Sequence, residues 1–405
     1  MRAKKRKRTD PRVTSSYYSS TCNNNGMFPM VVSNGPHDWV RTKAGRHNHF
    51  FPKEVKIGTS VYHLAARFEI PHSETDERVR WGGNASVRLY RIYGGEGTGD
   101  DALRLPHYLV LKAVSSFKNF KAEIENIGHV HAKWLEMLPR KHGNRELPII
   151  PALSASSVEF EDDCPQWLFA MEYFPMDIFM ITGSKGLSSH LTISAWLSIV
   201  ESACQNLITL HLMKMIHGDI KPENIMLKRP YVDSRKDSYL KIERMKSVFI
   251  DLEYAHSSSG GGIHSGGTVG YKSLSRLKRG NESSAFDDTF AFGVFLYVFM
   301  TTLDTPFSPK TGHIYCDYWT EKKNTPDMAM YLKRSNVYIH PNLSSPYIFK
   351  GMCVLLNSVF QDNGNFNNKD RNDFEYSVSR LKFCASHLRL EKLVELGKKH
   401  SIKGG

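Results

Sequence analysis

The chain has 405 residues, 40% of them hydrophobic and 11% aromatic, which is enough core for two or three domains or one large two-lobed enzyme. Its net charge of +13 favours acidic partners such as nucleic acid, nucleotides or an anionic surface. The six cysteines form no C-x-x-C pair, which argues against a zinc site or disulfide framework and for a reducing compartment. No secretory signal and no apolar run of about 20 residues is found, so we expect a soluble intracellular protein without a membrane span.

Residues 1–50 differ in composition from the rest of the chain. A basic cluster at residues 2–8 is followed by a Ser/Thr/Asn/Tyr-rich stretch without apolar periodicity. Such a segment buries too little apolar surface to offset its ordering entropy, so we expect a disordered tail. The basic cluster indicates a site for a nuclear-import receptor; a nucleic-acid contact and a plain solvated tail are the alternatives.

From about Val55 the pattern becomes globular and is rich in strands. We expect two short strands within 79–93, around Gly82-Gly83-Asn84, further strands over 107–114, 147–153 and 167–173, and one long helix over 117–138. These elements predict a first domain over 55–174, built from a sheet and a single long helix.

The second half of the chain has helical periodicity. We expect a long helix over 193–211, a short buried strand over 249–251, a buried helix over 289–300 and a late helix over 383–399. The fold class is therefore α+β, with a mainly helical second domain over 175–405.

The stretch His217-Gly218-Asp219-Ile220-Lys221-Pro222-Glu223-Asn224 organises the functional interpretation. Apart from Gly218, it fits the phosphoryl-transfer loop H-R-D-L-x-x-x-N. Asp219 would accept or orient the proton of the attacking hydroxyl, Lys221 would neutralise the γ-phosphoryl group, and Asn224 would bind a metal. The alternative is a helix-to-strand turn, where Asp, Pro and Asn are common.

Asp251 follows a hydrophobic strand downstream of Asn224, where kinases place the magnesium-binding aspartate of D-F-G. The triplet here is Asp251-Leu252-Glu253, so a glutamate replaces the glycine. We expect Asp251 to be the second metal ligand; a strand-end aspartate that caps a turn is the alternative.

Lys112 is a cation within an apolar strand, and a buried lysine is costly unless it is paired. In kinases such a lysine pairs with a glutamate of the following helix. Glu123 stands where that glutamate falls, and Glu125 is the second candidate. In kinases such a lysine binds the α- and β-phosphates of ATP. The alternative is an edge-strand lysine whose ammonium group extends into water.

Two further segments resemble kinase motifs. Gly267-Thr268-Val269-Gly270-Tyr271 resembles the G-T-x-x-Y segment that positions a protein substrate, and Thr268 would hydrogen-bond to Asp219 and Lys221. Asp288 opens a sequence that resembles D-x-W-S-F-G and would brace the backbone of the catalytic loop, a structural role.

Together these motifs resemble the eukaryotic protein-kinase fold, with a small β-rich N-lobe and a larger helical C-lobe. Lys221-Pro222-Glu223 is similar to the serine/threonine class. The resemblance implies ATP and Mg²⁺ as cofactors and proteins as substrates. It also implies nucleotide contacts from the phosphate loop and from the hinge; these residues are Gly82, Gly83, Val87, Met171, Glu172 and Phe174.

Several departures suggest a divergent branch. The glycine loop keeps only its middle glycine, Gly218 replaces the arginine, and Ser273-Leu274-Ser275 replaces A-P-E. With the basic tail, these features are similar to the conserved herpesvirus protein kinases of the gammaherpesvirus type. That resemblance implies an enzyme of the host nucleus and virion tegument that phosphorylates viral and host nuclear proteins. The polar loop Ser257-Ser258-Ser259-Gly260-Gly261-Gly262, between Asp251 and Thr268, matches an activation segment. Without the arginine, we expect activity that needs no phosphate on this segment.

Two other function classes remain open at this point. Small-molecule phosphotransferases of the aminoglycoside or choline kinase type share His-Gly-Asp and an Asn five residues after the Asp, but usually have histidine where Lys221 stands and lack Gly-Thr-x-x-Tyr. A nucleoside is a further small-molecule acceptor within this alternative. A pseudokinase scaffold is favoured by the poor glycine loop and Glu253. The presence of Lys112, Asp219, Asn224 and Asp251 argues against it.

Overall fold

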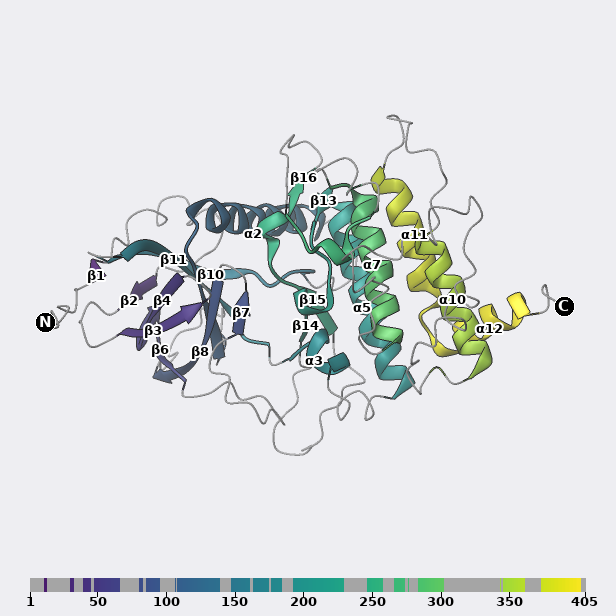
Figure 1. Cartoon of the computed structure of the whole chain (residues 1–405), viewed down its shortest axis with the longest axis horizontal. Helices are drawn as coiled ribbons and strands as arrows, with labels where there is room; N and C mark the ends of the chain where they lie inside the picture. The colour runs from purple at the N-terminus through teal and green to yellow at the C-terminus, as the bar shows by residue number, and fades with distance from the viewer. Residues whose placement is uncertain are drawn as a thin grey trace, which may run out of the picture. The chain divides into compact units, whose positions relative to one another are not determined.

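The computed structural model is a mixed α/β fold, with a β-rich part followed by several helices (Figure 1). It describes residues 11–12, 30–32, 39–44, 47–65, 80–82, 85–94, 106, 108–138, 147–160, 163–174, 176–183, 192–228, 246–257, 266–273, 276, 283–301, 343, 345–360 and 373–401. The chain divides into two compact units: unit 1 comprises residues 1–136 and 150–175, and unit 2 comprises residues 137–149 and 176–405.

Unit 1 is built on a nine-stranded antiparallel sheet in the order β1-β10-β11-β9-β8-β6-β5-β2, with β7 paired to β8. Its strands are β1 (Pro11–Arg12), β2 (Met30–Val32), β5 (Glu54–Ile57), β6 (Ser60–Leu64), β7 (Arg80–Gly82), β8 (Ala85–Gly94), β9 (Tyr108–Val114), β10 (Ala152–Phe160) and β11 (Asp163–Glu172). The apolar residues of β9 continue into a core cluster with Tyr62, Tyr90 and Leu168. Central strands that are buried in this way read as near-continuous apolar runs, which is why β9 could be recognised from the sequence.

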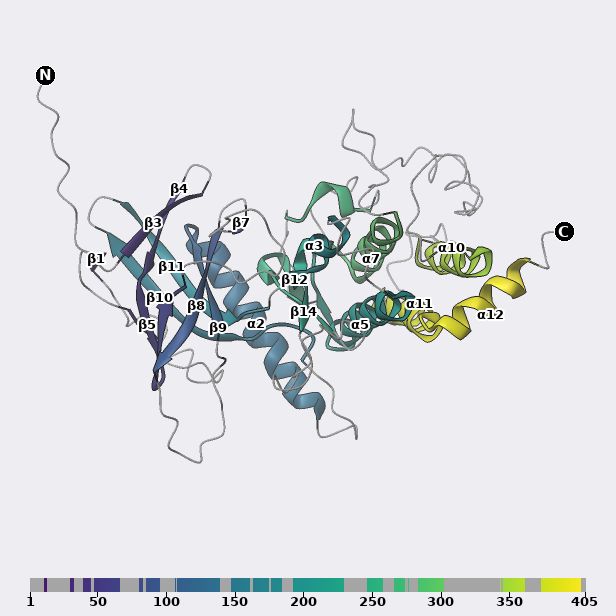
Figure 2. The same cartoon turned by 90° about the horizontal axis from the view of Figure 1, so that it is seen from below.

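Helix α2 (Phe117–Met137) packs against this sheet through one apolar face (Figure 2). Ile124, Ile127 and Val130 recur at helical spacing and are buried. Phe120 lies 6.4 Å from the ring of Trp167 and 6.1 Å from that of Phe169, measured between ring centroids. Trp167 and Phe169 belong to β11, which pairs with β9. The helix therefore packs against the strand next to the one that carries Lys112.

A hairpin of β3 (Trp39–Ala44) and β4 (His47–Pro52) docks on the same sheet. The ring of His49 lies 2.7 Å from the hydroxyl of Ser86 and 2.6 Å from that of Ser115. The Tyr90 hydroxyl donates to the carbonyl of Pro52 at 2.6 Å. Buried polar contacts of this kind tie the hairpin to β8 and to the end of β9.

The expectation of a disordered tail over residues 1–50 is therefore wrong for β2, β3 and most of β4. Met30 and Val32 are buried in the sheet, and His49 of β4 is buried against Ser86 and Ser115. The sequence signal was weak because these strands are short and separated by polar residues. The basic cluster at residues 2–8 lies outside the described residues.

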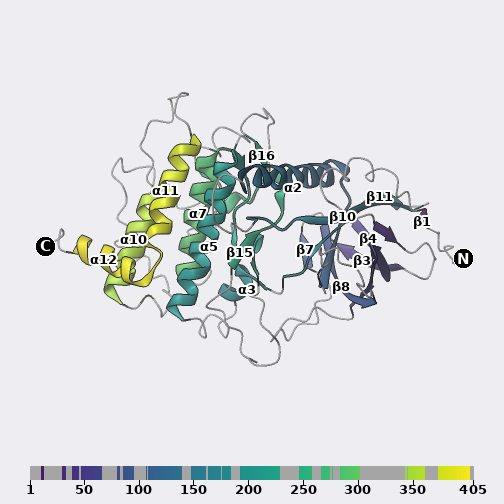
Figure 3. The ribbon, with the colours of Figure 1, turned by 180° about the vertical axis from the view of Figure 1, so that it is seen from behind.

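Unit 2 is mainly helical. Its long helices are α5 (Ile193–Leu212), α7 (Ala285–Met300), α10 (Pro346–Phe360), α11 (Asp373–His387) and α12 (Leu390–Ser401), and α5, α7 and α11 run side by side (Figures 1 and 3). Trp196 of α5 stacks on Phe299 of α7, with ring centroids 4.7 Å apart. Nearly every residue of α7 is buried, as the apolar run from Phe290 to Met300 predicts.

Short strands surround the stretch 217–224 in unit 2. Strand β12 (Met176–Asp177) leads into α3 (Ile178–Gly183) and pairs with β14 (Ile225–Lys228), which pairs in turn with β15 (Lys246–Phe249). Strand β13 (Met215–Ile216) pairs with β16 (His256–Ser257). All these pairs are antiparallel. In the chain, the stretch 217–224 directly follows β13 and is followed by β14.

Most elements predicted around the site are confirmed, and two others are wrong. The short strand predicted over 249–251 is shifted, since β15 ends at Phe249. The strands β7, β8, β9 and β11 and the helices α2, α5 and α7 lie where the periodicity placed them. The predicted strand over 147–153 is wrong: Ile149 makes an isolated bridge to Phe249, and β10 begins at Ala152. The predicted helix over 383–399 is two helices, because the chain breaks between α11 and α12.

Among the described residues, no helix combines the length and the apolar character that a membrane crossing requires.

Candidate active site

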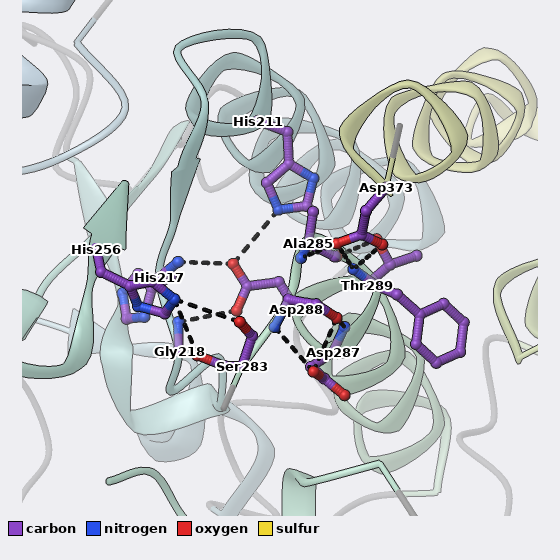
Figure 4. A network of polar contacts seen from close by, with 12 residues as sticks. His211, His217, Gly218, His256, Ser283, Ala285, Asp287, Asp288, Thr289 and Asp373 are labelled. Carbon is purple, nitrogen blue, oxygen red and sulfur yellow. Dashed lines mark hydrogen bonds and ion pairs between the residues drawn. The ribbon is translucent and has the colours of Figure 1, made fainter. Parts of the chain in front are cut away.

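Asp288 of α7 braces the start of the 217–224 stretch (Figure 4). Its carboxylate accepts the backbone N–H of His217 at 2.6 Å and that of Gly218 at 2.9 Å. The Nε2 atom of His211 lies 3.3 Å from the same carboxylate. Asp288 is buried, so these contacts replace water. The bracing geometry expected from the sequence is confirmed.

The electrostatics keep Asp288 ionised. Burial raises the pKa of this carboxyl, but the hydrogen bond and electrostatic interaction with His211, together with the contacts to His217, outweigh it, so the net pKa lies below the ordinary value. An ionised carboxylate can accept both backbone donors at once, which fixes the loop in one conformation.

A second layer of carboxylates holds the start of α7 itself (Figure 4). Asp287 completes a capping box by accepting the backbone N–H of Ser284 at 2.8 Å. Asp373 of α11 accepts the backbone N–H of Ala285 at 2.6 Å and that of Phe286 at 3.1 Å. Both acids lie where the helix dipole favours negative charge. The helix that carries Asp288 is thus fixed at the end nearest the loop.

The Asp219 carboxylate is held by three donors. Oδ1 accepts the backbone N–H of Thr268 at 2.6 Å. Oδ2 lies 2.8 Å from Nζ of Lys221 and accepts from Nδ2 of Asn224 at 3.1 Å. The residue is 5% exposed, so the orientation of the carboxylate is determined by the protein and not by water.

Thr268 joins this cluster in two different ways. Its backbone N–H reaches Asp219, whereas its hydroxyl accepts from Nζ of Lys221 at 2.8 Å. The sequence predicted contacts with both residues, and the structure brings all three together. Lys221 thereby bridges a carboxylate and the segment 266–271.

Asn224 and Asp251 lie at the joined end of β14 and β15. The backbone N–H of Ile250 donates to the carbonyl of Asn224 at 3.0 Å, which brings the residue preceding Asp251 beside Asn224. Asp251 has a φ of 64°, in the left-handed region that non-glycine residues rarely occupy. Such outliers cluster at functional sites, so this backbone geometry supports a functional role for Asp251.

The donor set of these two residues fits Mg²⁺. The hydrogen bonds of the Asn224 side chain come from its Nδ2 atom, so its amide oxygen can face a cation. Within the described ranges, no group of three His, Cys, Asp or Glu side chains gathers as a metal cluster. Mg²⁺ needs no such cage, since it is commonly bound through one or two protein oxygens, substrate phosphates and water.

Glu253, which stands where kinases have glycine, lies beside Tyr254 in a short 3-10 helix. Burial, followed by the negative charge of Glu253 and a hydrogen bond with it, raises the pKa of Tyr254 to about 12. The Glu253 carboxylate therefore interacts with a neighbouring phenol, a partner that the sequence analysis did not foresee.

Lys112 and Glu123 form a buried ion pair in unit 1. Nζ of Lys112 lies 2.8 Å from each carboxylate oxygen of Glu123, and the two side chains are 10% and 2% exposed. In the strand register, Val87 and Phe169 are the direct partners of Lys112, so the three side chains share one face of the sheet. The expected Lys112–Glu123 pairing is present. Glu125 instead lies in an exposed pair with Lys121, at 3.7 Å.

The remaining expected nucleotide contacts also lie in unit 1. Gly82 pairs with Ala85 where β7 turns into β8, and Gly83 lies outside the described residues. Met171 and Phe174 are buried at the end of β11, and Glu172 between them is half-buried. Gly82 therefore lies in the hairpin of β7 and β8, and β8 pairs with the strand of Lys112. Met171, Glu172 and Phe174 lie where the chain leaves the sheet at the end of β11.

Sequence reasoning missed three residues that support the site. Asp287 could have been found, since Ser284-x-x-Asp287 has the spacing of a capping box. Asp373 and Arg276 have no local signature, because each acts on a segment that is distant in the sequence. Arg276 donates to the carbonyl oxygens of Gly218 and Gly266.

Comparison with known proteins supports a protein-kinase relationship for about a third of the chain. The chain is 30% identical over 137 residues to the serine/threonine-protein kinase PknD of Chlamydia felis and 31% identical over 137 residues to PknD of Chlamydia abortus. Each match covers 32% of this chain and 14% of the bacterial protein. No family model matches the chain.

Proposed function

We propose that the chain is an ATP-dependent serine/threonine protein kinase with the two-lobed fold of that class. The observation that carries this proposal is the Asp219 cluster. A carboxylate oriented by Lys221, Asn224 and the Thr268 backbone stands on a loop that Asp288 braces. The similarity to bacterial serine/threonine kinases points the same way.

Asp219 orients the hydroxyl of a serine or threonine and accepts its proton. The hydroxyl oxygen bonds to the γ-phosphorus of ATP, the bond from that phosphorus to the β–γ bridging oxygen breaks, and ADP leaves. Lys221, already within 2.8 Å of Asp219, neutralises negative charge on the transferring group. Little covalent chemistry falls to the protein, so positioning and charge account for most of the rate.

Asn224 and Asp251 are the residues that would hold magnesium, which supplies positive charge to the phosphates when it is bound. Lys112, oriented by Glu123, would bind the α- and β-phosphates. Gly82, Gly83 and Val87 would line the phosphate side of the nucleotide. Met171, Glu172 and Phe174 would contact the adenine.

Protein substrates are favoured over small molecules by the segment 266–271. Thr268 within it is bonded to both Asp219 and Lys221, so a polypeptide segment is built into the acceptor side of the site. Small-molecule phosphotransferases usually have histidine in place of Lys221 and lack this segment. The buried Lys112–Glu123 pair argues against a scaffold that has lost catalysis.

The resemblance to herpesvirus kinases extends the proposal to location and substrates. The basic cluster at residues 2–8 and the departures at Gly218 and Glu253 support an enzyme of the host nucleus and virion tegument that acts on viral and host nuclear proteins. Import through residues 2–8 and a secondary nucleic-acid contact are tested by deleting them and following location and salt-dependent binding.

The test of substrate class is transfer of labelled γ-phosphate from ATP and Mg²⁺ to a nuclear protein extract. Parallel reactions would contain nucleosides, choline or an aminoglycoside in place of protein. We expect label on serine and threonine of proteins only. Label confined to a small molecule would replace the protein-kinase proposal. ATP binding with no transfer to any acceptor would support a scaffold.

A further inference from the structure

An arginine from a distant segment reaches the place where the catalytic loop lacks one. Nη1 of Arg276 donates to the carbonyl of Gly218 at 3.0 Å, and Nη2 donates to the carbonyl of Gly266 at 2.8 Å. The Arg276 side chain is buried, and the residue is 4% exposed. One guanidinium thus bridges the residue directly before Asp219 and the start of the segment 266–271.

The bridged backbones lie very close together. A Cβ atom added to Gly267, which has a φ of 91°, would stand 2.6 Å from the Gly218 carbonyl oxygen. A Cβ atom added to Gly218, at a φ of 80°, would stand 2.7 Å from the carbonyl oxygen of Tyr254. A side chain at Gly218 would therefore displace backbone, so a local arginine there would disturb this packing.

The position of Arg276 is itself fixed from α7. Its backbone N–H donates to the Ser273 hydroxyl at 3.0 Å, and that hydroxyl donates to Asp287. Asp287 belongs to the capping box of α7. The Ser273 contact lies where other kinases have A-P-E, so this region is held by a hydroxyl–carboxylate bond to α7.

The guanidinium of Arg276 donates to carbonyl oxygens through Nη1 and Nη2, while its buried Nε has no hydrogen-bond partner in the described part of the chain. Among the described residues, no carboxylate makes an ion pair with it. A guanidinium with two carbonyl acceptors forms charge-assisted hydrogen bonds and needs no phosphate to hold it in place.

We propose that Arg276 is a positioning residue that fixes the segment 266–271 on the catalytic loop without a phosphate on the activation segment. We call the two hydrogen bonds from Arg276 to the carbonyls of Gly218 and Gly266 the clamp. The effect of the clamp on catalysis rests on the proposed kinase function, but the clamp itself does not. Arg276 touches neither the reacting hydroxyl nor the phosphate. It acts by keeping Thr268 against Asp219 and Lys221, so its loss should weaken binding of a protein substrate more than binding of ATP.

The test compares the full-length wild type with Arg276→Met and Arg276→Lys. Arg380→Met is the matched control. Arg380 of α11 also donates to a backbone carbonyl, that of Ser358 on α10, at 3.0 Å. Hydrogen exchange of residues 266–271 measures the clamp directly. Steady-state kinetics measure KM for a protein substrate and for ATP, with wild type also assayed after phosphatase treatment.

We expect Arg276→Met to speed exchange of this segment and to raise KM for the protein substrate by about 10-fold or more, with KM for ATP nearly unchanged. Arg276→Lys should fall between, since an ammonium group keeps the charge but not the fork that spans two carbonyls. Arg380→Met should leave both measurements unchanged, and phosphatase treatment should leave wild-type activity intact.

The outcomes separate the clamp from the function. If the wild type transfers no phosphate, the kinase proposal is rejected. Faster hydrogen exchange of residues 266–271 in the Arg276 variants would still support the clamp in that case. Unchanged exchange and KM in Arg276→Lys would overturn the clamp, even if Arg276→Met failed to fold. Loss of wild-type activity after phosphatase treatment would overturn its independence from phosphorylation.

Discussion

The Lys112–Glu123 pair and the Asp219 cluster hold their charged groups in different ways. In unit 1, one strand and one helix supply an ion pair with both distances at 2.8 Å. In unit 2, the orientation of Asp219 depends on donors from its own loop and from Thr268, and the loop depends on Asp288. When one partner of the buried pair is removed, the other charge is left uncompensated. When one donor to Asp219 is removed, the carboxylate keeps the other two.

The largest effect should come from replacing one partner of the Lys112–Glu123 pair. Lys112→Met leaves the buried carboxylate of Glu123 without its cation, which costs about 3–5 kcal/mol of unfolding free energy, and it removes the proposed phosphate contact. We expect loss of phosphoryl transfer together with a clear drop in the denaturation midpoint of unit 1.

Two matched variants sharpen this prediction. Lys112→Met combined with Glu123→Gln should recover part of the stability but none of the transfer. Lys121→Met, which breaks the exposed pair with Glu125, should cost less than about 1 kcal/mol. Equal losses in Lys112→Met and Lys121→Met would show that burial of the first pair does not matter.

A smaller effect is expected from Asp288→Asn in the network. The amide keeps one acceptor for the two backbone donors, so we expect slower transfer and a cost of about 1–3 kcal/mol at pH 7. The folded-state pKa of Asp288 is lowered, so its ionisation stabilises the fold above the ordinary carboxyl pKa of about 3.9, and this contribution is lost as pH falls through the folded value.

The pH series has an internal control. The difference in unfolding temperature between wild type and Asp288→Asn should stay constant from about pH 7 to pH 5 and shrink below about pH 4. Burial raises the pKa of Asp373, with the Ala285 N–H opposing it, so Asp373→Asn should follow the opposite trend, with wild type losing stability relative to it as pH rises. Parallel curves for the two variants would contradict these charge assignments.

The smallest of these effects should come from the hairpin in unit 1, where we expect a change in stability alone. His49→Ala leaves the buried hydroxyl of Ser86 and the half-buried hydroxyl of Ser115 without their ring partner, at a cost of about 1–3 kcal/mol. His63→Ala is the control, because His63 lies exposed beside Glu54. A thermal melt in which both variants lose equally would argue against a structural role for the hairpin.

The same contrast explains what could be predicted from the sequence. Lys112 and Glu123 stand on adjacent elements whose periodicity is strong, so the strand and the helix could be assigned, and the kinase resemblance placed Glu123 ahead of Glu125 as the partner. Asp219 and Asn224 share one short loop, and their spacing was sufficient. Arg276 and Asp373 act on segments far away in the chain, and only three-dimensional packing brings them there.

Weak periodicity accounts for the errors in the fold. The short strands near Met30 and His49 lie among polar residues, so composition alone indicated disorder. The break between α11 and α12 has no glycine or proline to mark it, and both flanking helices carry the same amphipathic pattern. Local rules could place neither feature.

The most direct test of the account is the rate of phosphoryl transfer to protein by Asp219→Asn. This change keeps the shape of the side chain and removes the charge that accepts a proton, so we predict a fall of about 10²–10⁴-fold with an unchanged fold. Asp373→Asn is the matched control, since asparagine still caps the start of α7, and should transfer at nearly the wild-type rate. Transfer by Asp219→Asn within a few-fold of wild type would contradict the central claim.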